Sequence, residues 1–277
     1  MVIDYTLLLV LQGAALLGII AGMIGVFALL RQQSLLGDAI SHAALPGIVG
    51  MFLCTHSKNH WILLLGGAVV GSFGVWMVHY VLTHTTLKKD AVLGIVLSVF
   101  FGLGLVLMTV VQKYSLAEQA ILNKFFFGSV ATLLPIDILI IKIIAVLFFV
   151  VCVLFWKEIS LYVFDPVLCS SLGFSARIIE LLLTAMLVLT IVIGLQMVGV
   201  VLMSTMLIAP AAAARQWTKH VLSMFLLAGF FGCIAAITGV YVSSVVDHLP
   251  TGPAIVVVAS CIVIFSLMFA PRRKMAS

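Results

Sequence analysis

Charged residues are scarce in this chain of 277 residues: they make up 8% of it, whereas 64% of the residues are hydrophobic and the mean hydropathy is +1.36. Soluble domains are about 25% charged and about 45–50% apolar. No stretch between the apolar runs is long enough for a separate soluble domain. The N-terminal stretch MVIDYTLLLVLQ lacks a basic n-region, so we expect no cleavable signal. The composition therefore predicts a multi-span membrane protein.

The sequence also lacks the motifs of common enzymes. It has no GxxxxGKS/T loop, so we do not expect it to bind ATP by that route. It has no HExxH, no GxSxG and no pair of catalytic carboxylates, which argues against an enzyme. The net charge of +5 is scattered between apolar runs, which is not typical of nucleic-acid binding. The cysteines lie too far apart for a metal or redox motif, and we interpret them as packing residues: Cys54, Cys152, Cys169, Cys233 and Cys261.

Nine apolar runs approach the length of a membrane helix, which needs about 20 mostly apolar residues. The sixth and seventh adjoin at Gln196, so a count of eight is the alternative. We therefore predict an all-α integral membrane protein whose single transmembrane domain covers residues 1–277. The runs are 6–30, 36–54, 61–83, 91–112, 133–156, 178–195, 197–213, 221–245 and 253–271.

The basic residues predict the orientation, because Lys and Arg favour cytoplasmic loops. With nine spans and an external N-terminus, ten of them are cytoplasmic and three are external. An eight-span count with a cytoplasmic C-terminus fits this bias less well. The cytoplasmic set is Arg31, Lys88, Lys89, Lys157, Arg177, Arg215, Lys219, Arg272, Arg273 and Lys274; the external set is Lys58, Lys113 and Lys124.

Two loop segments on the predicted cytoplasmic side have helix signals. In residues 157–177, Asp165 is a candidate N-cap, Pro166 suits the first helical position and Gly173 is a stop. The second segment, 209–220, is a helix of small residues with a basic end. On the opposite side, residues 117–135 are interpreted as an interfacial, partly amphipathic segment.

Asp38 and His42 lie four residues apart in an apolar run, so they share one face of a helix. A charge inside a membrane costs about 3 kcal/mol on insertion scales, and such residues are usually functional. A carboxylate oxygen and an imidazole nitrogen form half of a site that suits Mn, Fe or Zn. Pro46, one turn later, removes the helical bond to the His42 carbonyl and predicts a kink. The alternative is a buried Asp–His hydrogen bond that fixes helix packing.

Other polar residues in the apolar runs are interpreted as structural. Glu180 has Arg177 as a partner three residues earlier. Asp137 and Lys142 are candidate interfacial anchors, and Gln196 is expected to bond across a helix interface. Three methionines at near-helical spacing are interpreted as core residues rather than as soft-metal ligands: Met197, Met203 and Met206.

Four stretches resemble, in order, the manganese/zinc/iron family of metal-importing ABC transporter permeases. The first, LLGDAISHAALPGI, contains Asp38 and His42, and the similarity covers nearly the whole chain. The other three are KKDAVLGIVLSVFFGLGLVLM (88–108), FDPVLCSSLGFSARIIELLL (164–183) and GLQMVGVVLMSTMLIAPAAAAR (194–215).

The resemblance implies a permease fold that imports a divalent transition metal, with Mn²⁺ favoured over Zn²⁺ or Fe²⁺. It implies two permease copies in a bacterial inner membrane, two cytoplasmic ATP-binding subunits and an extracytoplasmic metal-binding protein. Asp38 and His42 would line the pore between the copies, and no cofactor would be bound permanently. Two alternatives remain: a permease for a chelate such as a siderophore or cobalamin, and an intramembrane metal-dependent hydrolase.

By the same resemblance, the basic end of the segment 209–220 would seat in a groove of the ATPase. The segment 165–173 would make a neighbouring contact. The residues expected at this contact are Ala211, Ala212, Arg215, Lys219 and Asp165.

Overall fold

The computed structural model describes residues 5–56, 59–111, 135–246 and 249–270, together with Leu122 and Gly128. Within these residues the chain forms eleven helices and no strand. The helices are α1 (Tyr5–Leu30), α2 (Ser34–Thr55), α3 (His60–His84), α4 (Lys89–Val111), α6 (Pro135–Leu154), α7 (Trp156–Phe164), α8 (Pro166–Ser171), α9 (Ala176–Met197), α10 (Val200–Trp217), α11 (Val221–Val245) and α12 (Thr251–Phe269).

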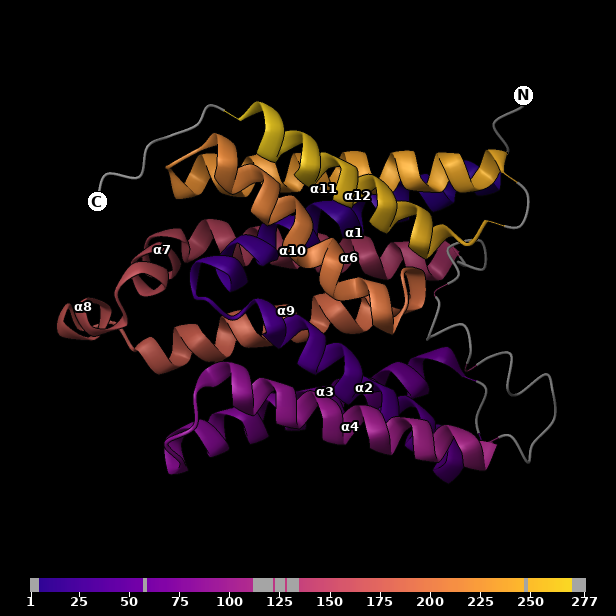
Figure 1. The fold of residues 1–277 in the computed structure, drawn as a ribbon, viewed down its shortest axis with the longest axis horizontal. Coiled ribbons are helices and arrows are strands. Elements are labelled where there is room, and N and C mark those ends of the chain that lie inside the picture. Colours follow the sequence, from indigo (N-terminus) through magenta and orange to yellow (C-terminus); the bar gives the residue numbers. More distant parts are fainter. Residues whose placement is uncertain are drawn as a thin grey trace.

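Eight of the described helices are long and apolar enough to cross a membrane by length and composition. The remaining long helix, α10, corresponds to the predicted run 197–213. It contains Pro210 and has Arg215 in its last turn. Nevertheless, α10 packs against α1, α2, α11 and α12, and Figure 1 shows it running back along the bundle from the end of α9. The chain therefore passes along the bundle at α10 as well.

Close helix contacts in the bundle depend on glycine. Gly18 of α1 faces Gly232 of α11, and a Cβ built on either residue meets the carbonyl group of the other. Gly47 of α2 and Gly66 of α3 are related in the same way. Since these contacts join backbone to backbone, small residues bring the helices together here as they do in other membrane bundles.

Two short helices, α7 and α8, project from one end of the bundle, where α6 ends and α9 begins (Figure 1). We call this end the α8 end. The Asp165 side chain accepts hydrogen bonds of 2.9 Å from the backbone N–H groups of Val167 and Leu168, and Pro166 opens the helix. Gly173 follows with a φ of +87°. The predicted cap, start and stop are therefore confirmed.

The α1–α2 turn also lies at the α8 end, and so do the junctions α3–α4 and α10–α11 (Figure 1). The described basic residues of the predicted cytoplasmic set are in or beside these junctions or in the α7–α9 region. This grouping agrees with the predicted orientation. Lys58, Lys113, Lys124 and Arg272–Lys274 lie outside the described residues, as does the interfacial segment 117–135 except for Leu122, Gly128 and Pro135.

Candidate metal site and its surroundings

Asp38 and His42 lie on the least covered face of α2. Both side chains are half-buried and Leu35, one turn before Asp38, is exposed, whereas most of the helix from Leu36 to Val49 is buried. Pro46 lies inside α2, which the structure describes as one continuous helix. The other sides of α2 pack against α3, α4, α9 and α10. The predicted pair therefore lies on the less buried face of a helix that is otherwise at the centre of the protein.

The His42 ring is positioned by Phe101 of α4, with ring centroids 4.8 Å apart and an edge-to-face angle of 76°. Its Nδ1 atom is buried, and no hydrogen-bond partner for it is found among the residues that the structure describes. Buried polar atoms are rarely left in this state without a reason. An imidazole nitrogen can bind a metal ion or accept a hydrogen bond, and within the described residues no hydrogen bond between Asp38 and His42 is found.

One copy of the chain supplies only part of a metal site. The described residues contain no group of three or more His, Cys, Asp or Glu side chains placed to hold a metal ion. Asp38 and His42 provide one carboxylate and one imidazole. Further ligands would have to come from outside the described part of this chain.

The polar residue Gln196 forms the predicted bond across a helix interface. Its Nε2 atom donates to Oδ2 of Asp137 on α6, at 3.1 Å. Asp137 is 4% exposed, so it is a buried acceptor and not the interfacial anchor that its sequence position suggested. The Lys142 ammonium donates to the side-chain oxygen of Gln12 on α1, at 3.4 Å.

The interpretation of three methionines as core residues is confirmed, because they are at most 1% exposed: Met197, Met203 and Met206.

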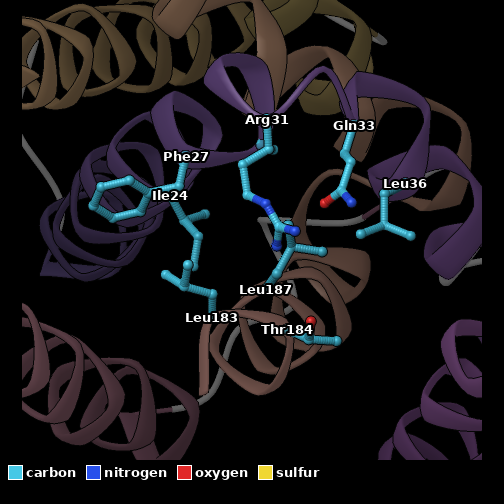
Figure 2. Close-up of a pocket in the computed structure, with 9 residues that line it drawn as sticks. Ile24, Phe27, Arg31, Gln33, Leu36, Leu183, Thr184 and Leu187 are labelled. Carbon is cyan, nitrogen blue, oxygen red and sulfur yellow. The ribbon is translucent and has the colours of Figure 1, made fainter. Parts of the chain in front are cut away.

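Glu180 pairs with a distant arginine, whereas the sequence suggested its neighbour Arg177. Arg31, at the end of α1, donates to the Glu180 carboxylate at 3.4 Å. Figure 2 shows the Arg31 side chain reaching from α1 toward the helix that carries Thr184 and Leu187, which is α9. The spacing of residues along one helix could predict only Arg177 as the partner of Glu180. Nothing in the hydropathy pattern indicated which helices are neighbours, so the contact with Arg31 could not be predicted.

The same guanidinium lies over the ring of Tyr162 on α7, 4.5 Å from its centroid. Burial raises the pKa of Tyr162 to about 12. The ring is therefore neutral at physiological pH, and its face attracts the cation. Arg31 thus connects three helices through one side chain.

A cavity of about 440 Å³ lies between α3 and α9 and reaches the start of α2. Its polar lining includes Gln33, Ser72, His79, Arg177 and Glu180, and the rest of the wall is mostly apolar. The cavity ends at Leu36, within one turn of Asp38. The first turn of α2, which precedes the candidate metal-site residues, therefore borders an open space.

The residues expected at an ATPase contact differ in their exposure. Arg215 and Lys219 are exposed and Ala212 is half-buried. Ala211, however, is fully buried in a cluster that includes Val26 of α1 and Met224 of α11, so it cannot make a direct surface contact. The sequence could not show this, because small residues suit an interior position as well as a surface groove.

The α8 end presents apolar side chains that the sequence analysis did not single out. Apolar residues recurring every three to four positions would have indicated this face, but the six-residue helix α8 is too short to show that pattern. The exposed large side chains are Phe164, Val167, Leu168, Leu172 and Phe174.

A helical bundle with membrane-length helices and a half-buried carboxylate–imidazole pair on one helix defines a multi-pass membrane protein with a candidate ion site. The sequence matches the ABC 3 transport family over residues 4–270, and the chain belongs to that family. It is a transport subunit and not an enzyme, since its relatives are membrane proteins of transport systems.

Two relatives illustrate the similarity. The zinc transport system membrane protein TroC of Treponema pallidum is 46% identical over 98% of this chain and 91% of its own length. The manganese transport system membrane protein MntC of Bacillus subtilis is 40% identical over 97% of this chain, but over only 62% of its own length.

Solved structures share the fold. PsaBC from Streptococcus pneumoniae, in complex with Fab, superposes with a TM-score of 0.85 at 29% identity and covers 98% of this chain and 94% of its own. A putative metal-chelate type ABC transporter in an inward-facing conformation gives a TM-score of 0.72 over 94% of this chain and 85% of its own. At 14% identity, the second match shows the fold alone.

Proposed function

We propose that this chain is the permease subunit of an ATP-driven importer for a divalent transition metal ion, with Mn²⁺ favoured and Zn²⁺ or Fe²⁺ as competitors. The observation that carries the proposal is the half-buried Asp38–His42 pair on the less buried face of α2, where no described residue hydrogen-bonds to the Nδ1 atom of His42. Oxygen and nitrogen ligands suit these ions. The names of the zinc and manganese relatives support the same class of substrate.

Two copies of the chain would complete the site. Closed homodimers place the same surface of each copy across a two-fold axis. Two Asp38 carboxylates and two His42 imidazoles would then give up to four protein ligands. Two carboxylates that face each other repel, and a divalent cation cancels that repulsion. The site would therefore hold the ion as cargo, and no cofactor would be bound permanently.

The α8 end would receive the ATP-binding subunits. Its exposed apolar side chains, including Val167 and Leu172, form a surface that water solvates poorly. Asp165 fixes the start of α8, and Arg215 and Lys219 are exposed at the same end of the bundle. In this proposal the roles expected from the sequence are exchanged: α8 makes the main contact because of these exposed apolar side chains, and the basic end of α10 makes the neighbouring one.

The remaining partners follow from the transport direction. An extracytoplasmic metal-binding protein would deliver the ion at the end opposite α8. The α8 end would face the cytoplasm of a bacterial cell, and residues 1–277 would form one permease domain in the inner membrane. An importer for a metal chelate is the alternative, and it would not need a charged pair in the pore.

The test is metal uptake by the complete transporter in liposomes, with Asp38→Asn and His42→Ala variants. Asp38→Asn keeps the shape of the side chain and removes its charge, so we expect loss of Mn²⁺ and Zn²⁺ uptake with normal insertion and dimerisation. Asp90→Asn, at an exposed position in the first turn of α4, is the matched control.

Uptake by Asp38→Asn at the wild-type rate would refute a metal site at this pair. Failure of both variants to assemble would make the pair structural. Uptake of a metal chelate that survives both substitutions would favour the alternative importer.

A further inference from the structure

An ion pair outside the candidate metal site joins the turn between α1 and α2 to α9. The Arg31 side chain is 15% exposed, whereas its Glu180 partner is 37% exposed. Tyr162, the second partner, is 2% exposed. Arg31 therefore has two partners, a buried ring on α7 and a partly solvated carboxylate on α9.

Arg31 is also fixed to the start of α2 through a tight turn. The backbone N–H of Arg31 bonds to the Phe27 carbonyl at 3.1 Å, and that of Gln33 bonds to the Ala28 carbonyl at 2.9 Å. Gln32 between them has a φ of +55°. Because α2 begins at Ser34, a displacement of Arg31 is carried directly into the first turns of the helix that holds Asp38.

The neighbourhood leaves room for such a displacement. A cavity of about 20 Å³ lies beside Arg31, between Phe27 and Gln33 on one side and Leu187 on the other (Figure 2). The 440 Å³ cavity lies on the Glu180 side and reaches Leu36. Close packing normally prevents side chains from changing partners, but both members of this ion pair border open space.

We propose that Arg31 is a positioning residue for transport, which links the α7–α8 segment to the metal-site helix through its contacts with Tyr162 and Glu180. This inference rests on the proposed function. A movement of α7 and α8 on the ATPase side shifts Tyr162, changes the Arg31–Glu180 contact and tilts the start of α2. Asp38 then changes its access to one side of the membrane.

The experiment uses the complete transporter in liposomes, with its ATP-binding subunits and its metal-binding protein. ATP hydrolysis is measured with and without Mn²⁺ or Zn²⁺, alongside uptake of the same ion. Arg31→Gln and Glu180→Gln each break the ion pair, and we expect both to lose metal-stimulated hydrolysis and uptake. The matched control is Arg177→Gln, an exposed arginine on α9.

The charge exchange Arg31→Glu with Glu180→Arg separates a coupling role from a merely structural one. Each single exchange places like charges together, and the double exchange restores the attraction, so we expect the double variant to regain stimulation that both single variants lose. A merely structural pair would change the amount of assembled protein and leave the ratio of stimulated to basal hydrolysis unchanged.

Three outcomes would overturn the proposal: normal stimulation in Arg31→Gln, equal losses in Arg177→Gln, or a double exchange as defective as the sum of its single changes. If neither Arg31→Gln nor Glu180→Gln assembles, the pair is structural and the proposal also fails. These outcomes are distinct from failure of the proposed function, in which the wild-type transporter would move neither ion.

Discussion

Replacement of Gly18 by alanine is expected to weaken the contact between α1 and α11. The new Cβ would meet the Gly232 carbonyl oxygen and would lie 2.8 Å from the carbonyl carbon and 2.9 Å from Cβ of Ala236. Carbon atoms prefer separations of about 3.5–4.0 Å, so the helices must part by about 1 Å. Two of the obstructing atoms belong to the backbone of α11 and cannot rotate away.

The magnitude follows from two opposing effects. Overpacking of a well-filled interface costs about 1–3 kcal/mol, whereas alanine gains up to about 1 kcal/mol over glycine in helix propensity. Gly102 of α4 is the matched control, because a Cβ there meets nothing within 4 Å. Gly102→Ala should therefore be neutral or stabilising, and Gly18→Ala should be net destabilising by about 1–2 kcal/mol.

The assay is thermal unfolding of the purified chain in detergent. For a protein of this size, about 1 kcal/mol corresponds to a shift of roughly 2–4 °C in Tm. Gly18→Ala should unfold below the wild type and Gly102→Ala at or above it. Equal Tm values for the two variants would show that α1 and α11 do not pack as closely as described.

Two further substitutions test other contacts. Gln196→Leu removes a donor to the buried Asp137 carboxylate, and should lower stability by about 1.5–3 kcal/mol in the same thermal assay; Gln12→Leu, which removes an exposed bond, should change little. Val167→Glu should abolish copurification of the ATP-binding subunits if α8 makes the main contact, whereas loss of copurification only in Arg215→Glu would move that contact to the end of α10.

The sequence predicted the helices because each signal was local. Apolar runs indicated the long helices, and Asp165, Pro166 and Gly173 marked the bounds of α8 through cap and turn preferences that act within a few residues. The bond made by Gln196 was also predictable, since a buried amide in a membrane needs a partner.

Partners that are distant in sequence could not be predicted in the same way. Arg31 and Glu180 are 149 positions apart, and hydropathy says that both helices cross the membrane without saying which ones are neighbours. Asp137 was misinterpreted for the same reason: its place near a helix start suggested an interfacial position, but α6 is packed so that the side chain is buried. The burial of Ala211 likewise depends on contacts between helices.

The pattern of exposure along α2 bears on how a membrane-length helix can accommodate a carboxylate at position 38. Asp38 is half-buried, while Ala39, Ala43 and Ala44 on the other faces are buried. If the less buried face met lipid, the charge would cost about 3 kcal/mol or more with nothing to offset it. In the proposed dimer, a hydrated path between two copies would remove most of that cost, and a cation in the path would turn it into an attraction. The cost of Asp38 is therefore an argument for the proposed second copy, rather than lipid, at this face of α2.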